Sequence, residues 1–347
     1  MSDRKQKVLK AVVSEYINTA EPVGSRTLVR RHKLGVSTAT IRNEMADLEE
    51  MGFLEQPHVS AGRVPSDRGY RFYVDNLMDQ DQLTSSERRL LNQLAEIRAQ
   101  EADTVLVAAS RLLSQVSNYV GLVTSPSLNA GRLASVKLIH LEQRLTLALL
   151  FTENGRMESR VLVLPPEIEP ADLEGLSTYF THRLAGRRLE EVTSELLDQI
   201  YAELLDDFRQ SRELLAEIAR SVLSWLRPSG RGKVYLGGTH NILKQPEFQD
   251  IDKVRHLLVL LEEEPLLRQL LQREPGIMIT IGRENELEAM QDCTVISATY
   301  TVQGQPAGTV AVLGPTRMDY SHVISVLQYM ASCLEEAFST QHSGSSS

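Results

Sequence analysis

Residues 36–75 read VSTATIRNEMADLEEMGFLEQPHVSAGRVPSDRGYRFYVD, and this stretch decides the fold of the N-terminal part of the chain. Its first part predicts a helix, because Ile41, Met45 and Leu48 recur at the spacing that places side chains on one helical face. Ser37 precedes this helix at the position where a side chain that caps the N-terminus is expected. The stretch therefore begins with a helix that has one buried face and one outward face.

The rest of the stretch and the residues before it complete the predicted unit. Downstream of the helix, Pro57, Gly62 and Pro65 exclude a further helix and predict a short hairpin with a long tip. Upstream, apolar residues at helical spacing predict two more helices, separated by Pro22. Three helices followed by a hairpin predict a winged helix-turn-helix unit over residues 1–78, in which the hairpin is the wing.

Charge is distributed unevenly along the 347 residues. The whole chain has a formal net charge of −9 at pH 7, which by itself argues weakly against a nucleic-acid partner. Residues 1–75, however, carry 12 Lys and Arg against 10 Asp and Glu, and the remainder carries 25 against 36. Between Gly24 and Asn43 lie five cationic residues and no acid. This local basic stripe is the minimum footprint for contacts with DNA phosphates.

The outward face of the helix after Ser37 carries residue types that read DNA bases. An Arg can bond O6 and N7 of guanine together, an Asn can pair with N6 and N7 of adenine, and small side chains permit close approach. The residues expected to contact DNA are Arg26, Arg30, Arg31, Thr38, Ala39, Thr40, Arg42, Asn43 and Arg63. The alternative is an ordinary solvated helix face, but the basic helix before it and the wing after it favour DNA reading.

Three arginines at the wing leave two interpretations open. Arg63 follows a glycine that lets the backbone reach outward, so its side chain either enters a narrow minor groove or is simply exposed. Arg68 and Arg71 either contact phosphates or pack against the next domain. Of these three arginines, Arg63 alone is included among the expected DNA contacts given above.

The sequence after the wing predicts a sheet that is interrupted by helices. Thr84 and Glu87 fit a capping box that opens a long helical stretch. Alternating apolar residues then predict strands, with Leu145, Leu147, Leu149 and Phe151 on one side of the third, at 119–124, 136–141, 145–152, 161–164, 277–281, 294–302 and 309–313. Asn154-Gly155 predicts a tight turn between the third and fourth strands.

This order predicts one domain inserted into another. The antiparallel-sheet domain comprises residues 84–190 and 276–338, and the inserted, mostly helical domain comprises residues 191–275. Residues 339–347 are expected to be a disordered tail. The whole chain is thus predicted to be an α+β multidomain protein.

The sequence contains no motif that requires catalytic chemistry. Lys233 follows glycines, but the Ser or Thr that a phosphate-binding loop needs after the lysine is a Val. Cys293 and Cys333 are far apart, with no CxxC pair and no clustered His, so neither a zinc site nor a disulfide framework is predicted. No apolar run approaches the roughly eighteen residues that span a bilayer, and no signal-peptide pattern occurs. We expect a cytoplasmic protein that is not an enzyme and has no cofactor, metal or membrane partner.

The stretch at residues 36–75 closely resembles the heat-inducible transcription repressor family, HrcA. The resemblance continues through Gly282-Arg-Glu-Asn285 and Thr309-Val-Ala-Val-Leu-Gly-Pro-Thr316 to the closing helix. It implies an N-terminal winged helix-turn-helix, a GAF-like antiparallel-sheet domain and an inserted dimerisation domain, in agreement with the interrupted sheet.

The resemblance also implies a role. Members of the family repress class I heat-shock operons, which encode the chaperonin and DnaK systems, by binding an inverted repeat called the CIRCE element. Their activity depends on the GroEL chaperonin, so that unfolded protein occupying the chaperonin leaves the repressor inactive. The expected partners are therefore double-stranded DNA, a second copy of the chain as a homodimer, and GroEL.

Two other interpretations stay open at this point. GAF-like domains often hold small ligands, which would make the chain a metabolite-sensing winged-helix regulator. A winged helix used for protein contacts would make it a protein-interaction module. A ligand-induced rise in melting temperature favours the first, and the absence of salt-dependent DNA affinity favours the second.

Overall fold

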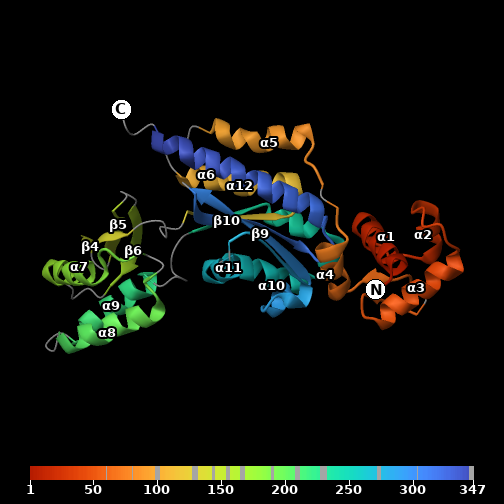
Figure 1. Ribbon diagram of the computed structural model, residues 1–347. Coiled ribbons are helices and arrows are strands. Elements are labelled where there is room, and N and C mark those ends of the chain that lie inside the picture. Colours follow the sequence, from red (N-terminus) through yellow and green to blue (C-terminus); the bar gives the residue numbers. More distant parts are fainter. Residues whose placement is uncertain are drawn as a thin grey trace. The chain divides into compact units, whose positions relative to one another are not determined.

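The structure is a computed structural model that describes residues 1–59, 61–79, 81–97, 102–126, 132–142, 145–153, 157–164, 169–188, 191–207, 212–226, 233–271, 275–302 and 304–343. The chain divides into two compact units. The first comprises Met1–Val123, Val234–Tyr300 and Thr309–Ser347, and the second comprises Thr124–Lys233 and Thr301–Gly308. Both combine helices with antiparallel sheets, which confirms the predicted mix of helices and antiparallel sheet but places a sheet in each unit (Figure 1).

The first unit begins with three helices, a two-stranded hairpin and a fourth helix. These are α1 (Asp3–Thr19), α2 (Ser25–Arg31), α3 (Thr38–Glu50), β1 (Leu54–Glu55), β2 (Val64–Pro65) and α4 (Asp67–Asn76). The predicted cap of α3 is confirmed, because Ser37 Oγ accepts a hydrogen bond from the backbone N–H of Thr40 at 3.1 Å. Ile41, Met45 and Leu48 are buried, as their spacing predicts. Helix α4 is not among the elements that the sequence patterns predict.

A five-stranded sheet is the centre of the rest of the first unit, although the adjoining ends of its β9 and β10, within Thr301–Gly308, belong to the second unit. Its strand order is β7 (Val234–Gly237), β3 (Val120–Thr124), β10 (Gln305–Pro315), β9 (Cys293–Val302) and β8 (Ile277–Ile281). In Figure 1 one face is covered by α6 (Ala102–Ser117) and α12 (Tyr320–Ser343), with α5 (Ser85–Glu96) packed on the outside of these two helices, and the other face by α10 (Ile251–Glu262) and α11 (Glu264–Leu271). The predicted capping box at Thr84 and Glu87 is confirmed at the start of α5.

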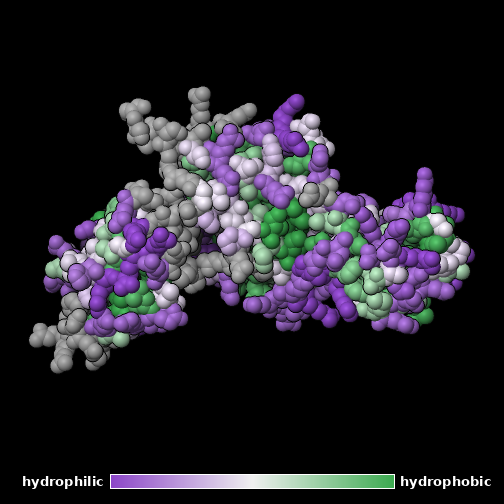
Figure 2. Space-filling view, in the orientation of Figure 1, coloured by the Kyte–Doolittle hydropathy of each residue, from purple (hydrophilic) through white to green (hydrophobic). Residues whose placement is uncertain are grey.

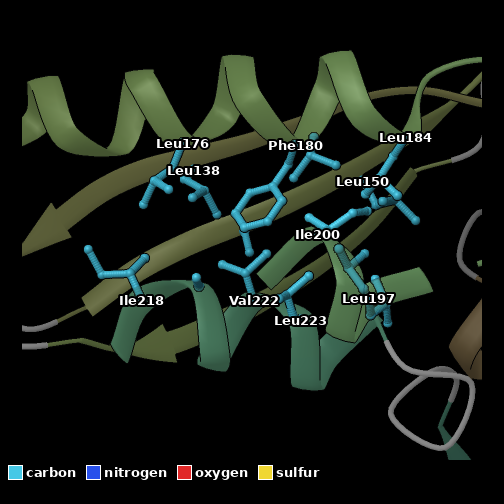
Figure 3. Close-up of a cluster of buried hydrophobic side chains, with 14 of the residues drawn as sticks. Leu138, Leu150, Leu176, Phe180, Leu184, Leu197, Ile200, Ile218, Val222 and Leu223 are labelled. Atoms are coloured by element: carbon cyan, nitrogen blue, oxygen red, sulfur yellow. The ribbon is translucent and has the colours of Figure 1, made fainter. Parts of the chain in front are cut away.

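The second unit is a three-stranded sheet packed against three helices. It contains β4 (Leu133–Glu142), β5 (Leu145–Thr152), β6 (Met157–Val163), α7 (Pro170–Leu184), α8 (Ser194–Asp207) and α9 (Arg212–Leu226). Apolar side chains from the sheet, α7, α8 and α9 point toward one another, with Phe180 fully buried among them (Figure 3). The predicted turn at Asn154-Gly155 lies outside the described residues.

The predicted domain boundaries differ from those of the structure. The strands between residues 133 and 163 pair only with one another among the described strands and share a core with α7–α9, so they belong to the second unit rather than to the larger sheet. Residues 234–271, predicted to lie in the insert, instead supply β7 to the five-stranded sheet and pack α10 and α11 against it. The predicted insert of residues 191–275 is therefore wrong at both ends.

The C-terminal tail begins later than expected. The final helix α12 continues to Ser343, so residues 339–343 are helical rather than disordered. Residues 344–347 lie outside the described part of the chain.

Candidate nucleic-acid interface

The helix α3 is held by its buried face and presents the other face to solvent. Ile41 and Leu48 are fully buried beneath it, where it packs on α1 and α2. Ala39, Arg42 and Asn43 are exposed on the outward face. The surface over α1, α2 and α3 is mostly hydrophilic in the view of Figure 2. The structure thus brings together the residues that the sequence proposed as base readers.

Three of the proposed cationic contacts are exposed and unengaged. Arg26 and Arg30 on α2 and Arg42 on α3 have no ion-pair partner among the described residues. Arg31 differs, because its guanidinium is hydrogen-bonded to the carboxylate of Glu15, a residue that is only 6% exposed. His32 Nε2 also lies 3.3 Å from Glu15 Oε2. Arg31 thus ties α2 to α1, while the other arginines are available to a partner.

The threonines at the start of α3 have a structural task. Thr40 Oγ1 lies 2.9 Å from Ser37 Oγ, in addition to the backbone bond that caps the helix. Thr38 and Thr40 are both half-buried, whereas Ala39 between them is exposed. The first turn therefore offers a small exposed side chain on a well-capped helix end.

The hairpin is joined to the segment between α1 and α2, a contact that the sequence did not reveal. The backbones of Val23 and Arg63 exchange two hydrogen bonds, of 2.8 and 2.9 Å. A Cβ on Gly62 would lie 2.4 Å from the carbonyl oxygen of Val23, so only glycine fits there. Gly62 therefore permits close backbone packing rather than an outward reach.

Arg63 lies at the base of the hairpin and not at its tip. Its Nε and one terminal nitrogen both lie 2.7 Å from Glu49 Oε2 on α3, and its side chain is only 20% exposed. The side chain is therefore not simply exposed in this structure, because Glu49 holds it against α3, and its entry into a minor groove stays a prediction.

The tip carries exposed residues that are not among the predicted DNA contacts. Val59 is 98% exposed, and His58 beside it is also exposed. Gln56 braces this loop, because its side-chain amide donates to the carbonyl oxygens of Val59 at 2.9 Å and Ala61 at 3.1 Å. The only sequence feature that could have indicated this exposed tip is a Gln shortly before a glycine-containing turn, and that feature is weakly specific.

The C-terminal half of α3 is acidic and is neutralised from outside the helix. Lys5 of α1 places its Nζ 3.0 Å from Glu44 Oε2 and 2.8 Å from Asp47 Oδ2. Hydrogen bonds to Asp47 and Glu44 raise the pKa of the Lys5 ammonium above its ordinary value. Glu50, by contrast, is exposed and has no cationic partner among the residues that the structure describes.

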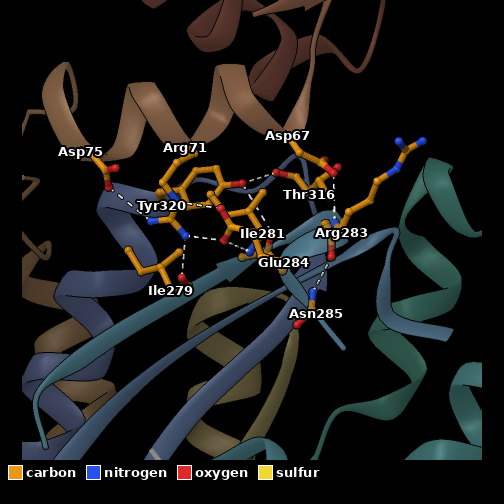
Figure 4. Close-up of polar contacts among 12 residues, drawn as sticks. Asp67, Arg71, Asp75, Ile279, Ile281, Arg283, Glu284, Asn285, Thr316 and Tyr320 are labelled. Atoms are coloured by element: carbon orange, nitrogen blue, oxygen red, sulfur yellow. Dashed lines mark hydrogen bonds and ion pairs between the residues drawn. The ribbon is translucent and has the colours of Figure 1, made fainter. Parts of the chain in front are cut away.

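Contacts through α4 fix this N-terminal part to the five-stranded sheet (Figure 4). Arg71 donates to Glu284 at 2.9 and 2.5 Å and to the carbonyl oxygen of Ile279 in β8 at 2.6 Å. Asp67 accepts a hydrogen bond from the backbone N–H of Arg283 at 3.0 Å. Arg68 stacks its guanidinium 4.7 Å from the ring centroid of Phe53. Of the two interpretations of Arg68 and Arg71, packing therefore holds in this structure, and for Arg71 it is packing against the sheet.

A family model described as the HrcA protein C-terminal domain matches residues 103–324, which is more than half of the chain. The heat-inducible transcription repressor HrcA of Pelotomaculum thermopropionicum is 42% identical over 97% of this chain and 96% of its own. The chain belongs to the HrcA family. The HrcA repressor of Moorella thermoacetica is 44% identical over 97% of both chains, and so agrees with the same assignment.

A solved structure supports the fold of this HrcA family member. A hypothetical protein whose crystal structure was determined at 2.2 Å resolution is 25% identical and superposes with a TM-score of 0.59. The match covers 98% of this chain and 99% of that one. The arrangement of helices and antiparallel sheets described above is therefore one that an experimental structure also contains.

Members of the HrcA family are transcription repressors of the heat-shock response and not enzymes. Within the described residues, no cluster of three or more His, Cys, Asp or Glu side chains is placed to hold a metal ion. None of the described helices is long and apolar enough to cross a membrane. The candidate site is the surface formed by α2 and α3, because Arg26, Arg30, Arg42 and Asn43 are exposed there.

Proposed function

We propose that this HrcA family member represses transcription by binding double-stranded DNA through a winged helix formed by α1, α2, α3 and the β1–β2 hairpin. The observation that carries the proposal is the first half of α3. Arg42 and Asn43 are exposed there as neighbours, with no partner among the described residues, on a helix whose opposite face is buried. These two side-chain types make bidentate bonds to guanine and adenine in the major groove.

The other proposed contacts position the helix. Arg26 and Arg30 are exposed on α2, where cations of a helix-turn-helix meet the phosphate backbone. Thr38 and Ala39 lie at the start of α3, where close approach to the groove is needed. Arg31 and Arg63 are engaged in ion pairs and are left out of the proposed contact set.

The proposed operator is the inverted repeat CIRCE element of class I heat-shock operons, which encode the chaperonin and DnaK systems. Family membership supports this assignment, as it supports a role for GroEL in keeping the repressor active. Incubation of the purified protein with DNA upstream of a chaperonin operon should give a footprint over both halves of an inverted repeat. DNA affinity that is absent, or that does not depend on salt, would contradict the proposal.

Regulation by heat gives a second test. A loss of about 1 to 2 kcal/mol in stability can change the active fraction of a repressor several-fold. Mild heating should therefore abolish operator binding by the purified protein, and addition of GroEL should restore it. Full retention of binding without the chaperonin through the heat-shock range would refute this part of the proposal.

The proposal includes a homodimer, because an inverted repeat calls for two-fold protein symmetry. The outer face of the sheet β4–β6 fits such a contact, since it is apolar on all three strands. Ile139, Leu147 and Val161 are cross-strand neighbours on it, and its most exposed members include Val161 at 53% and Val163 at 64%. A contiguous apolar sheet face of this kind can pack against a copy of itself.

A pair of matched substitutions tests this dimer contact. Val161→Asp places a charge on the apolar face, beside Leu147 of the central strand, and should give monomers in light scattering at micromolar concentration. Val259→Asp is the control, because Val259 on α10 is equally exposed, at 55%, but lies in the other unit. Dimers that persist in both variants would show that this face is not the contact.

A further inference from the structure

The acidity of the DNA-reading helix is the feature that the proposed function leaves unexplained. Helix α3 contains one cation, Arg42, and four acids. The acids are Glu44, Asp47, Glu49 and Glu50. They all lie after Asn43, toward the end of the helix where the macrodipole already places partial negative charge. A helix that approaches DNA would be expected to carry the opposite charge.

Three of these four acids hold cations that come from other elements. Glu49 binds Arg63 of the hairpin through two contacts of 2.7 Å, and it leaves the arginine side chain 20% exposed. Glu44 and Asp47 bind Lys5 in the same manner, and its side chain is 21% exposed. Both cations therefore lie beside the reading helix but point at its carboxylates.

A cation that is held in this way does not contribute a free contact to phosphates. Binding to random DNA depends almost entirely on such contacts, whereas operator binding also depends on base contacts at a fixed register. On the operator the base contacts fix the register, so a released arginine gains a contact only if a phosphate already lies within its reach, whereas on random DNA the protein can shift until one does. An acid that withholds such an arginine thus lowers affinity for random DNA more than affinity for the operator, unlike the loss of a phosphate contact that the wild-type protein makes on both DNAs.

We propose that Glu49 is a specificity-determining residue that withholds Arg63 from the phosphate backbone. The inference rests on the proposed function, because it assumes that α3 reads an operator. It also gives the hairpin base a role that differs from minor-groove reading by Arg63. The pair of Lys5 with Glu44 and Asp47 is a second instance of the same arrangement.

The test compares Glu49→Gln with Glu50→Gln, since the two residues are adjacent on α3 and lose the same charge. Glu50 has no cationic partner among the described residues, so its variant reports only the long-range effect of one removed charge, about twofold on either DNA. Glu49→Gln also releases Arg63. Its affinity for random DNA should rise on the order of tenfold, with a salt dependence steeper by roughly one unit. Its affinity for the operator should rise by at most about threefold.

A second variant, Arg63→Gln, removes the arginine and completes a double-mutant cycle with Glu49→Gln. Arg63→Gln should lower random-DNA affinity by no more than about twofold, because the wild-type side chain makes no phosphate contact there. In that background Glu49→Gln should behave like Glu50→Gln. Thermal unfolding of each variant confirms that it is folded at the assay temperature.

The outcomes separate this inference from the proposed function. If the wild-type protein shows no preference for the operator over random DNA, the proposed function fails and the inference fails with it. If the preference is present but Glu49→Gln and Glu50→Gln give equal effects, the inference alone is overturned. A tenfold rise that persists in the Arg63→Gln background overturns it as well, because Arg63 is then not the released group.

Discussion

Arg71 joins the N-terminal helices to the five-stranded sheet, and its removal should measurably loosen the first unit. The Arg71→Ala variant loses two bonds to Glu284, at 2.9 and 2.5 Å, and one to the carbonyl oxygen of Ile279, at 2.6 Å. Bonds to charged groups contribute about 1.5–3 kcal/mol each when they are shielded from water. The side chains of Arg71 and Glu284 are 30% and 37% exposed, so solvent screening reduces this. We expect a loss of about 2 kcal/mol for the whole contact.

The loss should depend on pH with a definite sign. Burial raises the pKa of Glu284, but hydrogen bonds from Arg71 and from the backbone N–H of Ile281 outweigh it and lower the pKa below its ordinary value of 4.5. A carboxylate with a lowered folded-state pKa stabilises the protein above its unfolded-state pKa and loses that effect as the pH falls through the folded value. The difference between wild type and Arg71→Ala should therefore be complete at neutral pH and shrink below about pH 4.5.

Urea unfolding at neutral and at acid pH measures both effects. Arg255→Ala is the control, because its pair with Asp252 is an exposed surface contact that contributes under about 0.5 kcal/mol. Arg71→Lys keeps the charge but loses the planar fork, and it should recover only part of the stability. The reasoning is refuted if Arg71→Ala is as stable as Arg255→Ala at neutral pH, or if acid leaves its deficit unchanged.

Three further predictions concern buried or closely packed residues. Gly62→Ala should destabilise the folded protein by about 1–3 kcal/mol, because its Cβ would meet the Val23 backbone. Gly175→Ala on α7 is the control and should not destabilise it, because its Cβ would meet nothing within 4 Å; equal effects of the two substitutions in urea unfolding would count against the close approach at Gly62. Phe180→Ala should cost the second unit about 3–5 kcal/mol in the same assay, and a loss below about 1 kcal/mol would contradict its buried position. Burial raises the pKa of Cys293 to about 12 and of Cys333 to about 11, so a thiol reagent at neutral pH should label both only after unfolding, and rapid labelling of the folded protein would contradict this.

Local sequence signals predicted the N-terminal elements well. The N-cap at Ser37 and the buried series on α3 depend on residues within a few positions of one another, and the structure contains both. The ion pair of Arg63 with Glu49 and the backbone bridge of Arg63 with Val23 depend on the tertiary fold. No rule based on sequence spacing could reveal these contacts. The sequence therefore predicted correctly that Arg63 lies in the hairpin, but it did not predict that the side chain turns toward Glu49.

The insert boundaries failed for a different reason. Alternation shows that a strand has two faces, but it shows neither which strand is its neighbour nor which face is buried. Leu145, Leu147, Leu149 and Phe151 form the more apolar side of β5, yet the structure buries the opposite side, which includes Leu150. The strands of the small sheet were therefore assigned to the larger one.

The central claim is that the outward face of α3 reads bases, and the most direct test is the affinity of Arg42→Ala and Asn43→Ala for operator and for random DNA over a salt series. Each variant should lose about 1–3 kcal/mol on the operator and far less on random DNA. Arg30→Ala is the comparison, since a phosphate contact should weaken both DNAs alike and reduce the salt slope by roughly one unit. Equal losses on the two DNAs for Arg42→Ala and Asn43→Ala would contradict the claim that α3 is the reading helix.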